Sequence, residues 1–455
     1  MEMTGMVDAH AIGRSIDEET SRVLPASAEH FRRSSELIPG GASRGRFWWP
    51  APIYVERARG VSLHDIDGRT YIDCLVGFGS MILGHAHPAV TDAVAAQVAL
   101  GTVFGAPCVQ EEHLARLVVS NVPGAERAVF VGSGTEATMT ALRIARAATG
   151  RDVVAKFEGG WHGAQDFLLH SFTETDGELT APRAVPSSAG LSRSSSRDVV
   201  VLPYNHDAAL VRIRDEAHRL ACVVVEPVQG AAGGLPTERE FLERLRAVCD
   251  ETGVLLVFDE VISGFRLGPA GAGGLYGVTA DLVTLGKIIG GGLSIGAVAG
   301  RADLMGRVAS REGRPVAASG TFAANPLSMA AGVAQLSVLL DDPDTYPRLA
   351  VLGQRMRDGL RQVLAAHGIR GWVTGVGSLW GLHFSAESPR TVRDLATASP
   401  SVARVLAAYL LLEGVVMSAP VHLGFLSTAH TEKDVDLVIS AHSSALKRMK
   451  EEGHV

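Results

Sequence analysis

Short apolar runs rich in β-branched residues alternate with longer amphipathic stretches through the middle of this chain. The amphipathic stretches span residues 88–100, 109–120, 135–148, 207–219 and 237–252, and they predict helices. Strands that are apolar on both faces need helices over both faces, as in a parallel sheet. The pattern therefore predicts an α/β fold with a mostly parallel sheet. Its expected strands are AVFV at 128–131, VVA at 153–155, VVVL at 199–202, CVVVE at 222–226, VLLVF at 254–258 and DLVTL at 281–285.

Both ends of the chain have a different pattern. Residues 16–37 read as one amphipathic helix that stops at Pro39-Gly40-Gly41. After about residue 340, a long helix at 346–366 leads into short strands and further helices at 400–413 and 432–451. This arrangement predicts a large domain over 75–340 and a smaller α+β domain over 341–455, which the N-terminal segment 1–74 joins.

Composition excludes several classes of function. The net charge is −7, with no basic tail or stripe, so we expect no nucleic-acid partner. No run approaches 18 apolar residues and the N-terminus lacks a signal-peptide pattern, so we expect a cytoplasmic protein without a membrane span. Four widely spaced cysteines without a CxxC pair predict free thiols and no zinc site. The HxH at His85 and His87 reads as a loop before a helix, so no metal is expected.

A polar segment from 171 to 198, Ser-rich at 186–197, interrupts the α/β pattern. Segments of this length and composition are either disordered insertions or lids over a site, and the sequence leaves both open.

Gly132-Ser133-Gly134-Thr135 joins an expected strand to an expected helix. The glycines let the backbone turn, and the first amides of the helix point beyond the strand end. Such an end binds phosphate through amide donors and the helix dipole. A plain tight turn would have the same sequence, and neither GxGxxG nor a Walker loop is present.

Acids and one lysine follow two other strands. Asp259 and Glu260 end the run VLLVF, at the strand edge where α/β sheets bind ligands. A carboxylate there can keep a cofactor's ring nitrogen protonated, cap a helix or bind Mg²⁺. Lys287 is one of only five lysines, and it lies between a buried strand and three glycines, where burial would leave its amine neutral and nucleophilic. For Lys156, beside Glu158, we expect a salt bridge instead.

Five ordered motifs give the chain a family resemblance. They are GSGTEA at 132–137, EPVQG at 226–230, FDEV at 258–261, LGKIIGGGLSIGA at 285–297 and SGTFAANP at 319–326. The chain resembles the class III aminotransferases, which use pyridoxal phosphate on fold type I. Within them it is most similar to the glutamate-1-semialdehyde aminomutase group. The likeness runs from about residue 36 to 433, so it covers about nine-tenths of the chain.

The resemblance implies a role for individual residues. Lys287 would form the Schiff base with the cofactor and move the proton, and Asp259 would pair with the pyridine nitrogen. Val261 and Trp161 would pack on the two ring faces, although the family more often has Tyr at the position of Trp161. Ser133, Gly134 and Thr135 would hold the phosphate. Thr321 would reach the phosphate of the partner subunit, so the active sites of a homodimer would be shared.

Departures from the aminomutases cluster where the substrate would lie. ASRGRFWW at 42–49 replaces their VNSPVR, and Arg44 matches the carboxylate-binding Arg of related β-amino-acid aminotransferases. Trp48 would line the same pocket, and His422 stands where the aminomutases carry Glu. We therefore expect an aminotransferase acting between a small amino donor and a carboxylate-bearing keto or aldehyde acceptor, with the aminomutase reaction as the alternative.

Two other classes fit less well. A cofactor-binding protein without turnover would not need both Lys287 and Asp259. An NAD-dependent dehydrogenase would need GxGxxG after a strand.

Overall fold

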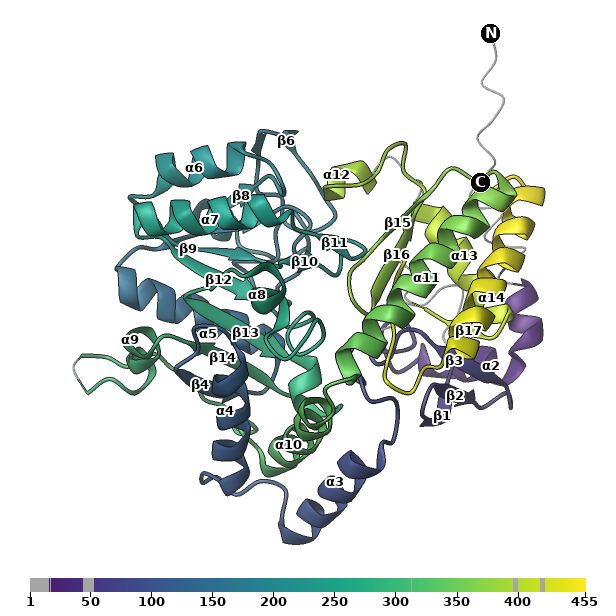
Figure 1. The fold of residues 1–455 in the computed structure, drawn as a ribbon, viewed down its shortest axis with the longest axis horizontal. Coiled ribbons are helices and arrows are strands. Elements are labelled where there is room, and N and C mark those ends of the chain that lie inside the picture. Colours follow the sequence, from purple (N-terminus) through teal and green to yellow (C-terminus); the bar gives the residue numbers. More distant parts are fainter. Residues whose placement is uncertain (1–15, 17, 44–52, 312, 396–399, 418–421) are drawn as a thin grey trace.

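A seven-stranded sheet forms the centre of the larger part of the molecule (Figure 1). The computed structural model describes the chain except residues 1–15, 17, 44–52, 312, 396–399 and 418–421. The strand order is β4-β14-β13-β12-β9-β5-β8, and only β14 runs antiparallel to its neighbours. The predicted α/β class and mostly parallel sheet are confirmed. The strands are β4 (Arg127–Val131), β5 (Val153–Phe157), β8 (Val199–Leu202), β9 (Leu220–Val225), β12 (Leu255–Asp259), β13 (Leu282–Gly286) and β14 (Gly296–Gly300).

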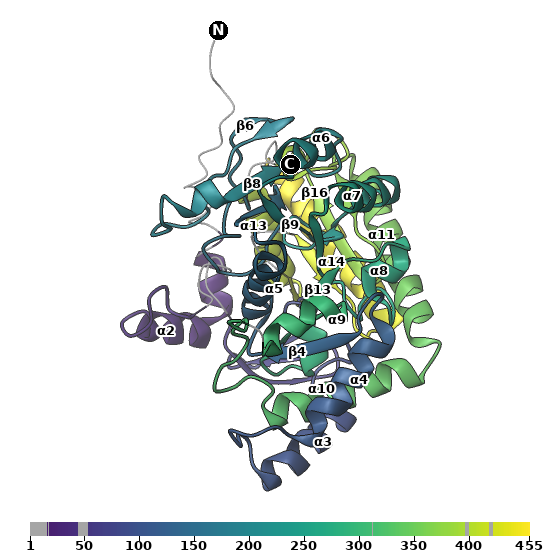
Figure 2. The same cartoon turned by 90° about the vertical axis from the view of Figure 1, so that its left-hand side faces the viewer.

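Helices cover both faces of this sheet because every strand is apolar on both sides. Along β9, Val224 belongs to the core that contains α5 (Gly134–Thr149), whereas Val223 belongs to the core that contains α7 (Arg239–Thr252). Figure 2 shows the helices on either side of the strands. The five helices expected between residues 88 and 252 are all present. They are α3 (Pro88–Leu100), α4 (Val109–Asn121), α5, α6 (Ala208–Glu216) and α7.

Strand β14 has no counterpart among the expected strands. Its sequence, GAVAG, has a single β-branched residue and a glycine at each end. Gly296 is required there because an added Cβ would lie 2.0 Å from the carbonyl oxygen of Ser133. The close approach of two backbones next to the start of α5 therefore explains why this strand lacks the usual composition.

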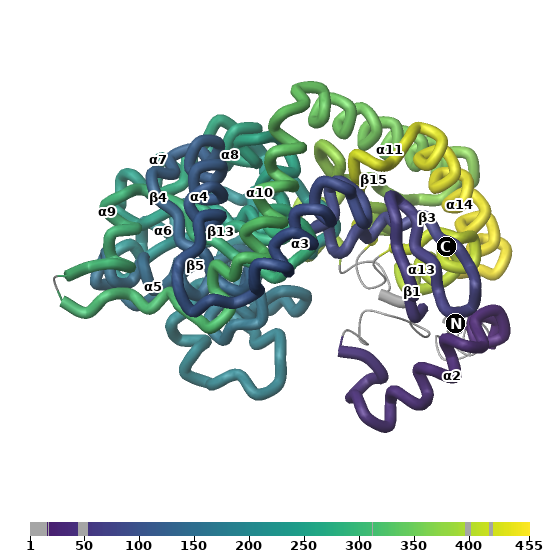
Figure 3. Tube along the Cα trace, turned by 90° about the horizontal axis from the view of Figure 1, so that it is seen from below, coloured from purple at the N-terminus to yellow at the C-terminus, as the bar shows by residue number. Residues whose placement is uncertain are grey.

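The N- and C-terminal segments together form the smaller part of the molecule. Strand β3 (Thr70–Asp73) pairs in parallel with β17 (Val415–Val416), so distant parts of the chain share the sheet β1-β2-β3-β17. Figures 1 and 3 show these N-terminal strands beside the C-terminal helix. The domain boundaries at residues 75 and 341 stay a prediction. The other elements are β1 (Val55–Arg59), β2 (Ser62–Asp65), α11 (Thr345–His367), β15 (Trp372–Thr374), β16 (Leu379–His383), α13 (Pro400–Leu412), β18 (Leu423–Phe425) and α14 (Glu432–Glu451).

Two segments differ from, or add to, the sequence-based expectations. The single helix expected over 16–37 is interrupted at Leu24, and α2 (Pro25–Ser34) starts anew, because proline has no amide hydrogen to continue a helix. Segment 171–198 carries the short hairpin β6 (Gly177–Glu178) and β7 (Ala181–Pro182) and the 3₁₀ turn η2 (Ser195–Asp198).

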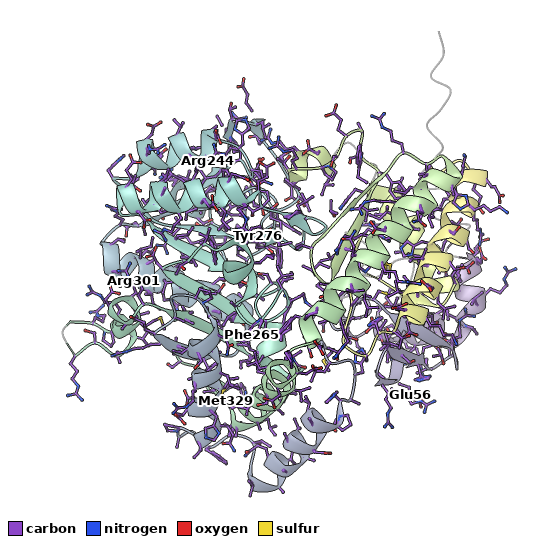
Figure 4. The ribbon with its side chains drawn as sticks, viewed as in Figure 1. Glu56, Arg244, Phe265, Tyr276, Arg301 and Met329 are labelled. Carbon is purple, nitrogen blue, oxygen red and sulfur yellow. The ribbon has the colours of Figure 1, made fainter. Side chains whose placement is uncertain are left out.

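Buried and exposed side chains follow this two-part plan. Figure 4 shows Arg244 and Arg301 on the outside of the larger part and Phe265 near its junction with the smaller part. Phe265 is fully buried, whereas the two arginines are about half exposed. Across the residues that the structure describes, no helix combines the length and the apolar character needed to cross a membrane.

Candidate active site

A cavity of about 260 Å³ opens at the edge of the large sheet where its parallel strands end. Gly132 and Lys287, which directly follow β4 and β13, and Asp259, which ends β12, all line it, because the carboxyl ends of parallel strands meet at one edge. Seven of the residues singled out in the sequence lie around this one cavity. They are Ser133, Gly134, Thr135, Trp161, Asp259, Val261 and Lys287.

The start of α5 forms one wall of the cavity. Ser133 caps the helix, since its Oγ accepts a hydrogen bond from the amide of Glu136 at 3.2 Å. The Glu136 carboxylate in turn accepts from the amide of Gly132 at 3.0 Å. The amides of Gly134 and Thr135 belong to the first turn, which has no acceptor within the helix. This wall therefore offers amide donors and the positive end of a helix dipole to an anion.

Asp259 ends β12 and has hydrogen bonds to both carboxylate oxygens. Its Oδ2 lies 2.7 Å from Nδ1 of His162, and its Oδ1 accepts from the Val261 amide and the Thr284 hydroxyl, both at 3.1 Å. Burial lowers the pKa of His162, so the neutral imidazole donates from Nδ1. The neighbours therefore fix the orientation of the Asp259 carboxylate at the cavity wall.

Lys287 begins the short 3₁₀ turn η3 (Lys287–Gly290) directly after β13. Its φ is 48°, in the left-handed region that non-glycine residues rarely adopt, and such strain concentrates at functional positions. Burial lowers the pKa of its amine, while Asp259 and Glu226 act in the opposite direction. Burial therefore favours the neutral form of the amine, which is the form that attacks a carbonyl group.

Trp161 and Val261 supply the apolar surfaces of the cavity. The Trp161 amide donates to Oε1 of Glu226 at 2.7 Å, and its ring centroid lies 5.0 Å from that of Phe172. Val261 lies against the first turn of α5, where a Cβ on Gly134 would come within 3.0 Å of its Cγ1. Glycine at position 134 therefore keeps the helix end and Val261 in close contact.

These residues fit pyridoxal phosphate. The helix end suits its phosphate, the Asp259 carboxylate suits its ring nitrogen, and the neutral amine of Lys287 suits its aldehyde carbon. Buried Nε2 of His162 has no hydrogen-bond partner among the described residues, so the cavity wall also holds a polar atom free for a ligand or water.

Four expected site residues lie elsewhere or outside the described residues. Thr321 is exposed and does not line the cavity of its own chain. Arg44 and Trp48 fall in the range 44–52, outside the described residues. His422 is 2% exposed inside the smaller part, where its Nε2 lies 3.1 Å from Nε2 of His442, and it does not line the cavity.

The salt bridge expected between Lys156 and Glu158 is wrong. The Glu158 carboxylate instead makes a bidentate pair with Arg393, at 2.7 and 2.8 Å. Lys156 instead donates to the backbone carbonyls of Gly160, Leu168 and His170.

Sequence reasoning missed the two titratable residues His162 and Glu226, which also line the cavity. His162 was adjacent to the expected stacking residue Trp161, and Glu226 began the motif EPVQG, so both were visible in the sequence. The sequence did not show the partners of these residues, since His162 lies 97 positions from the Asp259 that it contacts.

Comparisons with known proteins agree with this geometry. A family model for class-III aminotransferases matches residues 48–420. The chain is 42% identical over 429 residues to a glutamate-1-semialdehyde 2,1-aminomutase of Methanopyrus kandleri, covering 94% of this chain and 98% of the relative.

Two solved structures are similar in both fold and sequence. A β-phenylalanine aminotransferase from Variovorax paradoxus superposes with a TM-score of 0.88 at 35% identity, covering 97% of this chain and 98% of the other. A transaminase with pyridoxal phosphate bound superposes with a TM-score of 0.87 at 34% identity, covering 95% and 100%.

Proposed function

The chain belongs to the class-III aminotransferase family, and from that premise we propose that it moves an amino group between two separate small molecules. As a member of the family it is an enzyme of amino-group transfer whose cofactor is pyridoxal phosphate. In the proposed reaction a small amine is the donor, and a keto or aldehyde compound bearing a carboxylate is the acceptor. The observation that carries the proposal is the convergence of Lys287, Asp259 and the start of α5 on one cavity.

Lys287 is proposed to hold the cofactor and to move the proton during transfer. Burial lowers the pKa of its amine and so favours the neutral form. A neutral amine is both the nucleophile that binds an aldehyde and a base that accepts a proton. The cofactor, when bound, supplies an electron sink for the carbon that loses the proton.

Asp259 is proposed to keep the ring nitrogen of the cofactor protonated. A carboxylate aimed at that nitrogen favours its charged form. The hydrogen bonds from His162 and Thr284 hold the carboxylate in place at the cavity wall.

The remaining cofactor contacts are proposed for the residues that line the same cavity. Ser133, Gly134 and Thr135 bind the phosphate with amide and hydroxyl donors, and Trp161 and Val261 pack on the two ring faces. The phosphate contacts would fix one end of the cofactor, and the two ring-face contacts would fix the plane of its ring.

A homodimer is proposed, in which Thr321 of the partner subunit completes the phosphate site. Two observations support this. Thr321 is exposed, so it is accessible to a second subunit, and the neighbouring Phe322 is 64% exposed and would be buried by such a contact. A cytoplasmic location is proposed because all four cysteines are free thiols, as expected in a reducing compartment.

The substrate carboxylate is proposed to bind Arg44, with Trp48 lining the pocket beside it. Arginine makes bidentate hydrogen bonds to carboxylates. The similarity to a β-phenylalanine aminotransferase supports a substrate of that kind, with a carboxylate and an aromatic or apolar side chain.

A second candidate is the intramolecular aminomutase reaction, which the 42% identity to an aminomutase favours. One experiment separates the two. The enzyme loaded with pyridoxamine phosphate is incubated with glutamate-1-semialdehyde alone. Sustained turnover to 5-aminolevulinate would defeat the aminotransferase proposal. A single turnover or none, with turnover restored by an amino donor and a keto acid, would support it.

A further inference from the structure

Lys156 is a buried cation that the proposed reaction does not use. It lies in β5 and is 0% exposed. Its Nζ donates to the backbone carbonyls of Gly160 at 2.7 Å, Leu168 at 3.1 Å and His170 at 2.5 Å. An ammonium has three N–H donors, so all of them are used. All three acceptors belong to one loop, residues 158–170, which carries Trp161 and lines the cavity.

Burying such a cation is expensive. Desolvation disfavours the ammonium and lowers the pKa of Lys156 to about 7. An apolar side chain at this position would avoid the cost, and the strand around it is apolar. The three carbonyl contacts are therefore the feature of Lys156 that an apolar residue could not supply.

One peptide group of this loop is hydrogen-bonded to an ionisable side chain at each of its two ends. The carbonyl of Gly160 accepts from Lys156, and the amide of Trp161, in the same peptide unit, donates to Oε1 of Glu226 at 2.7 Å. The other oxygen of Glu226 accepts from the amide of Gly230 at 3.2 Å. The peptide is planar, so fixing both its ends fixes the plane from which the Trp161 side chain departs.

The two partners also match the peptide's own polarity. The Lys156 amine donates to the carbonyl, which is the negative end of the peptide dipole, and the Glu226 carboxyl accepts from the amide, which is the positive end. On the far side, the Trp161 ring packs against Phe172, with centroids 5.0 Å apart. The backbone and the ring of Trp161 are thus restrained independently.

We propose that Lys156 and Glu226 are positioning residues that act through the Gly160–Trp161 peptide to hold the Trp161 ring against the cofactor. The proposal rests on the role proposed above for Trp161. Neither residue needs to touch the reacting atoms, and the two act as a unit because they share one peptide.

The test compares Lys156→Met with a matched control, Arg357→Met. Arg357 is also a buried cation on backbone carbonyls, donating to Gly377 and Leu379 at 2.8 and 2.9 Å, but it lies in α11, away from the cavity. Both variants should lose thermal stability. In Lys156→Met alone, amide hydrogen exchange over residues 160–171 of the apoenzyme should rise by about tenfold or more. The circular dichroism of the bound cofactor should also weaken.

Two further variants make the test decisive. Glu226→Gln should weaken the cofactor's circular dichroism too, and the double variant should change it by less than the sum of the singles, since both act on one peptide. If Lys156→Met does not fold, Lys156→Gln, which keeps two donors without the charge, takes its place. Additive effects, or loop exchange and dichroism equal to those of Arg357→Met, would overturn the proposal.

Trp161→Leu separates this inference from the proposed function. If Trp161→Leu leaves cofactor affinity and dichroism unchanged, the stacking role of Trp161 fails, and the positioning proposal fails with it. If Trp161→Leu alters both while Lys156→Met alters neither, only the positioning proposal fails.

Discussion

Gly296→Ala should damage the phosphate site through a contact between two backbones. An alanine Cβ at position 296 would lie 2.0 Å from the carbonyl oxygen of Ser133 and 3.1 Å from the amide of Gly134. Real Cβ contacts rarely fall below 3.0 Å, so the start of α5 must retreat by about 1 Å. That is enough to misplace an amide donor, because hydrogen bonds to anions need distances of about 2.7–2.9 Å.

The expected loss follows from that displacement. Losing one hydrogen bond to a charged phosphate costs about 1.5–3 kcal/mol, which lowers cofactor affinity by about 10- to 100-fold. Overpacking should also lower the free energy of unfolding by about 1–3 kcal/mol. Titration of the apoenzyme with pyridoxal phosphate measures the affinity, and thermal unfolding measures the stability.

Gly300→Ala is the matched control. Gly300 ends the same strand at the other edge of the sheet, where a Cβ would lie 2.5 Å from the carbonyl oxygen of Asp281. It should lose similar stability and keep its cofactor affinity. If Gly296→Ala binds the cofactor as tightly as the unmodified enzyme while melting like Gly300→Ala, the start of α5 does not bind the phosphate.

Three other substitutions test the remaining roles. Asp259→Asn should keep the cofactor but slow amino transfer by about 10²-fold or more, because the ring nitrogen loses its charge partner; a near-normal rate in a steady-state assay would assign this task to another acid. Thr321→Ala should weaken cofactor binding in equilibrium titrations, and affinity should rise with dimerisation; a monomer in sedimentation that binds the cofactor tightly would refute shared sites. Arg44→Ala should cost about 1.5–3 kcal/mol in kcat/KM with carboxylate substrates and leave simple amines nearly unaffected; equal losses on both would exclude a carboxylate contact.

The local pattern of the sequence was enough to predict most strands and much of the cavity. Runs such as VVVL are strands because β-branched side chains pack well on both faces of a covered sheet. Asp259 ends one of these strands and Lys287 directly follows another. Because parallel strands end at the same edge of a sheet, the two residues could be predicted to lie together.

Features that depend on distant partners could not be predicted this way. Strand β14 is mostly glycine and alanine, and Ser133 approaches its backbone at Gly296, so nothing local to GAVAG marks it as a strand. Glu158 pairs with Arg393, which lies 235 positions away, so its neighbour Lys156 was assigned the wrong partner. His422 was expected at a substrate site because of its position in the aminomutase motif, whereas its side chain is buried in the smaller part.

The central claim is that Lys287 is the lysine that holds the cofactor. Borohydride reduction of the holoenzyme makes the bond between lysine and cofactor permanent, and peptide mapping by mass spectrometry then locates it. The account predicts the adduct on Lys287 alone, and none in Lys287→Ala, which should still bind the cofactor through the phosphate contacts. An adduct on Lys156, the fully buried lysine of β5, would contradict the assignment of the active site.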